Sequence, residues 1–170
     1  GRFTALRLFK LKEWSFKGLQ RIYPETNQKT FRRGLNTSEA CFPIPCRQPI
    51  NGETIYVNEA PADAGMAFKL TGCYSVAAMY ADNIPLIVNV LRSLCPDSEI
   101  IIVADNDQYD GGNNKGVEVC ELALRETEGA TLMIIPQFDE SEKIKKYKDL
   151  TDFTSAYGED KAKNLLASYK

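Results

Sequence analysis

Apolar residues run without interruption from 100 to 104, just after Glu99, and give way to the polar triplet 105–107. An unbroken β-branched run, rather than an alternating one, is typical of a strand buried on both faces, as in a parallel sheet. In open α/β sheets, ligands bind beyond the carboxyl ends of the strands. Asp105 and Asp107 fall at that end of the predicted strand, so we expect the functional residues there.

Asp105 and Asp107 are two residues apart, and a strand has a period of two, so both side chains leave an extended segment on the same side. Such carboxylates repel each other unless a proton or a cation lies between them, and a hard divalent cation is the usual partner. The alternative is a polar loop that opens with an Asx-turn. In either case Asp110, Gly111 and Gly112 are expected to form the turn that follows.

Downstream of residue 50 the pattern predicts strands that alternate with helices. Besides the run that ends at 104, strands are expected at 54–57, 74–80 and 131–135, and helices at 61–70, 84–94 and 114–128. Pro61 stands in the first turn of the first helix and Gly72 follows its end. Alternation of this kind favours a parallel sheet with right-handed crossovers. The predicted fold class is therefore α/β, with a Rossmann-like, mostly parallel four-stranded sheet flanked by helices.

Residues 1–50 predict a small β-rich segment instead. Two β-rich runs, at 3–9 and 14–23, are expected to pair as a hairpin. Lys29, Arg32 and Arg33 then surround an aromatic residue before a glycine. This basic strip is either the solvated face of the hairpin, which is the commoner case, or a surface that holds phosphates or a single strand. Three prolines and an Asn-Gly turn between residues 43 and 52 mark the boundary with the α/β part.

Composition narrows the choice of protein class. A chain of 170 residues can bury a real core. It has no apolar stretch of transmembrane length and no signal-peptide pattern, so we expect a soluble, cytoplasmic protein that does not bind membranes. The net charge of −2 gives no general attraction to nucleic acid. Five cysteines without histidine argue against a structural zinc site, although Cys41 and Cys46 could form half of one. The chain begins inside a strand-like pattern, which suggests a piece of a longer protein.

The predicted topology brings further acids to the same edge of the sheet. Glu59 follows the first core strand as Asp105 follows the third, and Asp63 lies one helical turn beyond Glu59. Three or four carboxylates without histidine or cysteine are typical of a Mg²⁺ or Mn²⁺ site. A calcium-binding EF-hand loop counted from Asp105 is excluded, because Asp110 and Gly116 stand where it needs glycine and glutamate.

In this context Glu59 after a strand, followed later by a strand that ends in Asp105-Asn106-Asp107, resembles the Toprim domain. Toprim is the metal-binding module of bacterial primases, topoisomerases and some nucleases. The resemblance is closer to the primases of plasmids, conjugative elements and phages. It is carried by residues 55–59, by the block 80–107, by Lys115-Gly116 with Glu118 and Glu121, by Leu150-Thr151-Asp152-Phe153, and, before Toprim, by residues 19–22 and 29–34.

The resemblance implies a Toprim-like α/β fold and the catalytic core of a DNA primase. Such an enzyme makes short RNA primers on single-stranded DNA from ribonucleoside triphosphates, with Mg²⁺ or Mn²⁺ as cofactor, and a replicative helicase or helicase domain is the expected protein partner. The implied catalytic and metal-binding residues are Glu59, Asp105 and Asp107, with Asp63 and Asp152 as further metal-binding acids. The implied nucleic-acid or nucleotide-binding residues are Arg21, Lys29, Arg32, Arg33 and Lys115. The implied parts are a β-rich segment at 1–50, a Toprim domain at 51–138 and a helical extension at 139–170.

The chain departs from the family pattern in places. Ala60 stands where a glycine usually follows the motif glutamate. Thr154 and Ser155 follow Asp152 where a second acid is usual, which weakens the case for a second metal ion. Two alternatives stay open: a Toprim-type nuclease or topoisomerase, and a non-enzymatic nucleic-acid-binding Toprim protein that does not need the acids. The β-rich segment and the lack of a catalytic-tyrosine context argue against a topoisomerase.

Overall fold

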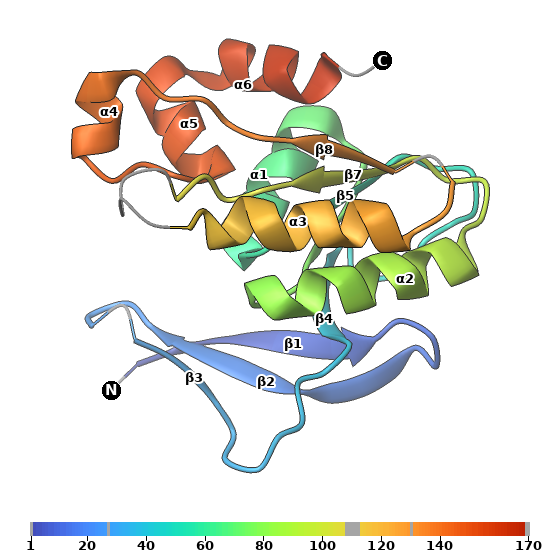
Figure 1. Ribbon diagram of the computed structural model, residues 1–170. Helices are drawn as coiled ribbons and strands as arrows, with labels where there is room; N and C mark the ends of the chain where they lie inside the picture. The colour runs from blue at the N-terminus through green and yellow to red at the C-terminus, as the bar shows by residue number, and fades with distance from the viewer. Residues whose placement is uncertain (1, 27, 108–112, 130, 169–170) are drawn as a thin grey trace.

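A computed structural model describes residues 2–26, 28–107, 113–129 and 131–168 (Figure 1). The strands are β1 (Thr4–Lys10), β2 (Ser15–Tyr23), β3 (Gln28–Phe31), β4 (Ala40–Ile44), β5 (Ile55–Asn58), β6 (Tyr74–Ala77), β7 (Ile100–Val103) and β8 (Thr131–Ile134). The helices are α1 (Pro61–Thr71), α2 (Ile84–Leu94), α3 (Lys115–Glu126), α4 (Glu140–Ile144), α5 (Leu150–Tyr157) and α6 (Glu159–Ala167), with a 3₁₀ turn at Ala81–Asn83. The turn expected at Asp110, Gly111 and Gly112 lies outside the described residues.

The strands form one mixed sheet in the order β3-β2-β1-β4-β6-β5-β7-β8. β6, β5, β7 and β8 run parallel to one another. β1, β2 and β3 pair antiparallel, as the predicted hairpin requires, and β4 pairs antiparallel with both β1 and β6. The α/β class is confirmed. The expected four-stranded, mostly parallel sheet is wrong in extent, because the four parallel strands form half of an eight-stranded mixed sheet.

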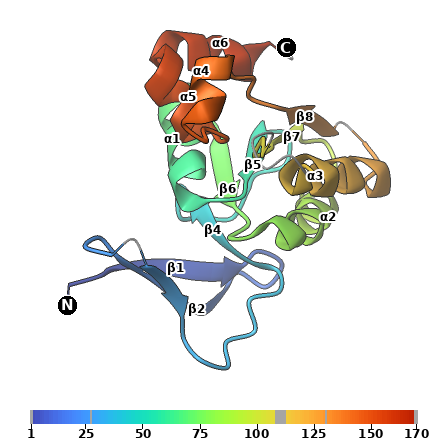
Figure 2. The same ribbon diagram turned by 60° about the vertical axis from the view of Figure 1, so that its left-hand side comes forward.

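β4 joins the two halves of the sheet (Figure 2). Its first residues, Ala40 and Cys41, pair with β1, whereas Pro43 and its neighbours pair with β6 alone. Proline is tolerated in a strand where one side has no partner to satisfy. The prolines that mark a boundary in the sequence therefore lie in and next to the strand that connects the two parts in space.

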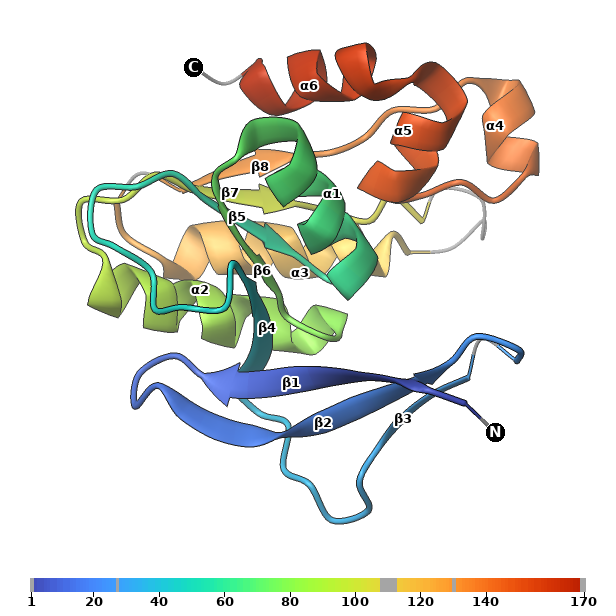
Figure 3. The ribbon, with the colours of Figure 1, turned by 180° about the vertical axis from the view of Figure 1, so that it is seen from behind.

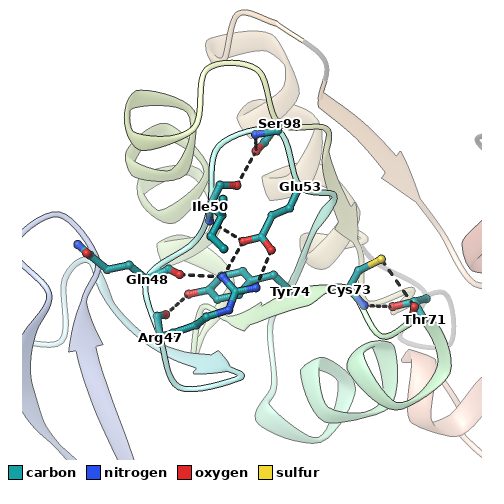
Figure 4. A network of polar contacts seen from close by, with 9 residues as sticks. Arg47, Gln48, Ile50, Glu53, Thr71, Cys73, Tyr74 and Ser98 are labelled. Carbon is teal, nitrogen blue, oxygen red and sulfur yellow. Dashed lines mark hydrogen bonds and ion pairs between the residues drawn. The ribbon is translucent and has the colours of Figure 1, made fainter.

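The connection from β4 to β5 is held by a polar network around Glu53 (Figure 4). Both carboxylate oxygens of Glu53 accept hydrogen bonds from the Arg47 guanidinium, at 3.0 and 2.7 Å. The Ile50 backbone N–H donates to Glu53 at 2.6 Å. The hydroxyl of Tyr74 on β6 donates to the Arg47 carbonyl at 2.8 Å, beneath the guanidinium. A bidentate arginine–carboxylate pair is geometrically specific, so this network holds the connection from β4 to β5 against β6 in a defined conformation.

Helices cover both faces of the parallel strands, α2 and α3 on one side and α1, α5 and α6 on the other (Figures 1 and 3). Ile100 and Ile102 of β7 lie in the core formed with α2 and α3, whereas Ile101 and Val103 lie in the core formed with α1 and α6. This arrangement is what a continuous apolar strand predicts. Within the described part of the chain, no helix is long and apolar enough to cross a membrane.

The helices predicted at 61–70, 84–94 and 114–128 are confirmed as α1, α2 and α3, within two residues at each end. The strand predicted at 74–80 is shorter, since β6 ends at Ala77. Met79, two residues later, has a φ of 77°, in the left-handed region that a strand does not use. The chain therefore turns toward α2 earlier than its apolar pattern indicates.

Candidate functional site at the acidic edge of the sheet

The site is built where β5 and β7 end side by side, with Asn58 opposite Val103. Glu59 and Asp105 follow these positions by one and two residues, so the expected convergence of the two acids at one edge is present in the structure. Asp105 is 6% exposed, and Asp107 and Glu59 are partly buried. Burying a charged carboxylate costs free energy unless a partner of opposite charge or a hydrogen bond compensates it. The groups that contact these acids therefore show how their charge is stabilised.

Lys148, which the sequence analysis did not single out, lies between the two aspartates. Its Nζ is 3.0 Å from Oδ2 of Asp105 and 3.3 Å from Oδ1 of Asp107. Burial alone would lower the pKa of Lys148, but the charges of these carboxylates raise it above its ordinary value, so the side chain stays an ammonium ion. A cation does lie between the paired aspartates, and in this structure it is a lysine.

Buried carboxyl groups at this edge hold their protons unusually tightly. Burial, together with the charge of Glu59, raises the pKa of Asp105 to about 7, although Lys148 opposes the shift. Burial also raises the pKa of Glu59, again against Lys148. One lysine therefore does not neutralise the acids gathered here, and perturbed carboxyl groups of this kind are frequent at functional sites.

A second group of acids joins α1 to the start of α5. Asp63, on the first turn of α1, accepts hydrogen bonds from the Thr151 backbone N–H at 2.9 Å and from its hydroxyl at 2.7 Å, both through Oδ1. Its other oxygen, Oδ2, is buried and accepts no hydrogen bond. Asp149 caps α5 by accepting from the Asp152 N–H at 2.7 Å. Burial and the nearby charge of Asp63 raise the pKa of Asp149 to about 7.

Asp149 is an acid that the sequence analysis missed. The expected second acid after Asp152 is absent, but Asp149 precedes it by three residues, next to Lys148. Asp152 itself accepts the Lys148 backbone N–H at 2.9 Å, so it holds the chain in place in this structure. An Asp at the start of a helix is usually an N-cap. The sequence alone therefore does not indicate that Asp149 could also bind a metal ion. The sequence signal that could have identified Lys148 and Asp149 is their position directly before the motif at residues 150–153.

Among the residues that the structure describes, no three acidic or cysteine side chains form a group that could already hold a metal ion. The chemistry of the edge nevertheless suits one. It offers several carboxylates, one orphaned buried carboxylate oxygen and a lysine in the position of a cation. Hard divalent cations take such oxygen ligands. The possible zinc site at Cys41 and Cys46 has no support, because Cys41 is buried against the Phe9 carbonyl and Cys46 is exposed.

The start of α3 fixes the segment that carries the two aspartates. The side-chain oxygen of Asn114, the cap of α3, accepts from the backbone N–H of Asp107 at 3.0 Å, and its amide donates to Asn106 at 2.8 Å. Gly116 lies so close that a Cβ added to it would be 2.4 Å from the Asp105 carbonyl oxygen. Glycine is therefore required at 116 for close approach of the helix, not for turn formation.

Replacing Gly116 by Ala is expected to destabilise the fold by about 2 kcal/mol or more, because the added methyl group meets backbone that cannot move without displacing Asp105. Gly65→Ala in α1 is the matched control. Its Cβ would meet only a side-chain atom at 3.9 Å, so it should be neutral or stabilise by about 0.5 to 1 kcal/mol. Urea unfolding of both variants measures the difference. Equal effects would mean that α3 does not press on Asp105 as described.

The basic residues separate onto different surfaces. Leu8 of β1 packs against Ala64 and Ala77 of the α/β part, and the strand register places Lys29 on the same face as Leu8. Arg21 lies on the opposite face, with its guanidinium 5.4 Å from the Phe3 ring centre.

Arg32 and Arg33 are exposed just after β3, and Arg32 lines a shallow hollow with Arg21 and Phe16. Lys115 is exposed at the start of α3, 3.1 Å from Asp82. The strip that is continuous in sequence is therefore not one continuous surface.

The small net charge of the chain hides a strong asymmetry. Residues 1–39 contain nine lysines and arginines against three glutamates, whereas the rest of the chain has twelve cations against twenty acids. The β1–β3 half of the sheet is therefore strongly basic, beside an acidic α/β half. An excess of cations in one part of a chain is one sign of nucleic-acid binding, and here the cations are spread over more than one face of that part.

Comparison with known proteins gives likeness in structure but not in sequence. No protein-family model matches the chain, and no curated protein matches its sequence. A solved structure from bacteriophage T7, of the lagging-strand DNA polymerase interacting with the primase domains of two gp4 subunits bound to an RNA/DNA hybrid and dTTP, aligns with a TM-score of 0.58. The alignment covers 82% of this chain and 69% of that chain, at 15% identity. The chain thus shares the fold of a primase domain, and membership of the Toprim family stays a prediction.

Proposed function

We propose that this chain is the catalytic core of a DNA primase, which synthesises short RNA primers on single-stranded DNA by metal-dependent nucleotidyl transfer. The observation that carries the proposal is the gathering of Glu59, Asp105 and Asp107 at the carboxyl ends of parallel strands. The same eight-stranded sheet has a strongly basic β1–β3 half. The fold shared with a phage primase domain supports it. That neighbour is bound to an RNA/DNA hybrid and dTTP, the classes of ligand that the proposal requires.

Mg²⁺ or Mn²⁺ would be held by Asp105 and Asp107, with Glu59 beside them and Asp63 and Asp149 as acids for a second ion. Asp152, expected from sequence as a further ligand, would act by holding the backbone of Lys148. When bound, the metal supplies positive charge to the triphosphate and favours ionisation of the attacking 3′-hydroxyl. Burial raises the pKa of Glu59. A more basic carboxylate is a better acceptor for the proton of the 3′-hydroxyl.

The reaction joins the primer 3′-oxygen to the α-phosphorus of a ribonucleoside triphosphate, and pyrophosphate leaves. Lys115, exposed at the start of α3, would meet the phosphates, since a helix start and a cation both favour anions. Lys29, Arg32 and Arg33 would hold the template strand. A replicative helicase, or a helicase domain of a longer protein, is the protein partner that this function proposes.

The experiment that tests the function offers single-stranded DNA, labelled ribonucleotides and Mn²⁺ to the full gene product. Short RNA that forms only with template and metal supports a primase. Cleavage of the DNA strand would instead support a nuclease. Binding of the strand without metal, with no nucleotide consumed, would support a non-enzymatic binding protein.

Replacing Lys29, Arg32 and Arg33 together by Ala is expected to weaken single-strand binding and to lower the slope of log affinity against log salt by about 0.7 for each phosphate that the variant no longer binds. Binding measured by fluorescence anisotropy at several salt concentrations gives the slope. Lys163→Ala, exposed on α6, is the control and should change neither quantity. An unchanged slope in the triple variant would mean that these residues do not contact phosphates and are only solvated surface residues.

A further inference from the structure

Lys148 differs from an ordinary surface lysine in how its backbone is held. Its N–H donates to the Asp152 carboxylate at 2.9 Å, and its carbonyl accepts from the Asn106 N–H at 2.7 Å. These bonds tie it to the first turn of α5 and to the segment between the two aspartates. Its side chain is 33% exposed, compared with 62% for Lys115 at the same edge of the sheet.

The ammonium group lies between the two carboxylates that would hold the proposed metal ion. It contacts one oxygen of Asp105 and one of Asp107, at 3.0 and 3.3 Å. A divalent cation bound between these two carboxylates would lie beside the ammonium group, and the two like charges would repel each other. Metal binding to Asp105 and Asp107 is therefore most favourable when Lys148 moves away from them.

We propose that Lys148 is the resident counter-ion of the Asp105–Asp107 pair, which the catalytic cation has to displace and which then binds a phosphate of the incoming nucleotide. This inference rests on the proposed function, because it concerns the same metal site. The ammonium offsets part of the charge of the two carboxylates and so lowers their affinity for metal. Since the backbone of Lys148 is fixed at both ends, the displaced side chain stays within reach of the site.

The displaced ammonium then needs a new partner, and the triphosphate is the anion that the reaction brings to this edge. Binding of nucleotide therefore lowers the free-energy cost of moving Lys148, and metal and nucleotide favour each other's binding beyond their direct contact. Coupling of this kind is reciprocal by thermodynamic necessity. The metal site would fill chiefly when substrate is present.

The test measures Mn²⁺ affinity by the electron paramagnetic resonance signal of free Mn²⁺, at one pH and ionic strength, with and without a non-hydrolysable ribonucleoside triphosphate. Lys148→Met should bind Mn²⁺ at least about tenfold more tightly than the unchanged protein without nucleotide, and nucleotide should strengthen its Mn²⁺ binding several-fold less. Lys145→Met is the matched control, because Lys145 is exposed and pairs with Glu142. It should behave like the unchanged protein. Equal or weaker Mn²⁺ affinity in Lys148→Met would overturn the inference.

Removing Lys148 leaves two carboxylates facing each other, so the variant could unfold without metal. A second readout covers that case: the rise in melting temperature on adding Mn²⁺ should be larger in Lys148→Met than in the unchanged protein, and an equal or smaller rise would count against the inference. Lys148→Arg, which keeps the charge, should bind Mn²⁺ no more tightly than the unchanged protein, and tighter binding would contradict a counter-ion role.

Failure of this inference is distinguishable from failure of the proposed function. If the unchanged protein binds Mn²⁺, Asp105→Asn abolishes that binding and Lys148→Met has the same affinity, only the role of Lys148 is wrong. If neither the unchanged protein nor Lys148→Met binds Mn²⁺ with or without nucleotide, the metal site fails, and the proposed function fails with it.

Discussion

Replacing Asp105 by Asn is expected to abolish primer synthesis in the full gene product, with a loss of about a thousandfold or more, while single-strand affinity stays within a few-fold. Asp105 is the most buried of the three catalytic candidates, and both Glu59 and Lys148 act on its charge. A group that stabilises charge in the transition state changes the rate, whereas the proposed template-binding residues Lys29, Arg32 and Arg33 would set the affinity for the strand. Asn keeps the size of the side chain, so the loss would reflect missing charge.

The matched control is Asp97→Asn. Asp97 is exposed near the opposite end of β7, where it accepts a hydrogen bond from Asn51, and its replacement should leave synthesis unchanged. Incorporation of labelled ribonucleotide on single-stranded DNA gives the rate, and circular dichroism checks the fold. Should both Asp105→Asn and Glu59→Gln keep making primers, the enzymatic role of this edge would be refuted and the binding-protein alternative would gain.

The free energy of unfolding of the metal-free protein is expected to fall by a few kcal/mol as the pH rises from 5 to 8. Burial raises the pKa of Asp105 and of Asp149 each to about 7 in the folded state, while carboxyl groups of an unfolded chain titrate near 4. Between these values the folded state holds protons that the unfolded state has released. This contribution to stability is complete below about pH 4 and is lost as the pH rises through 7.

Urea unfolding in EDTA at half-unit pH intervals measures this dependence. Mn²⁺ should remove most of the fall at pH 7 and 8, because it binds the ionised carboxylates of the folded state. Asp105→Asn should flatten the EDTA profile, since it removes one of the titrating groups. A stability that climbs steadily to pH 8 in EDTA would show that the acids at this edge are not buried together.

The sequence was most informative where a local pattern has one physical cause. The apolar run before Asp105 identifies a strand covered on both faces, and the topology that follows from it places Glu59 at the same edge. β4 was missed because Pro43 usually stops a strand, and only its one-sided pairing makes it acceptable. The net charge of −2 did not reveal the uneven distribution of charge, because it averages a basic half and an acidic half of the chain.

Lys148 and Asp149 could not be recognised from spacing alone. They lie far along the chain from Glu59 and Asp105, and only the packing of α5 against α1 and the loop after β7 brings them to the site. For Asp152 the position was predicted but the contact was not. It lies at the expected place, but its carboxylate is used by the Lys148 backbone. Catalytic and metal-binding roles for all the named residues stay predictions.

The proposed function requires a divalent cation where β5 and β7 end. Fe²⁺ in place of Mg²⁺, with ascorbate and peroxide, cleaves a protein backbone close to the bound metal, and mass spectrometry of the fragments locates the cuts. A cation bound at this edge should give cuts near Glu59 and near residues 105–107, and these cuts should be prevented by excess Mg²⁺ and absent in Asp105→Asn. Cuts that cluster elsewhere, or that persist unchanged in Asp105→Asn, would show that no divalent cation binds there.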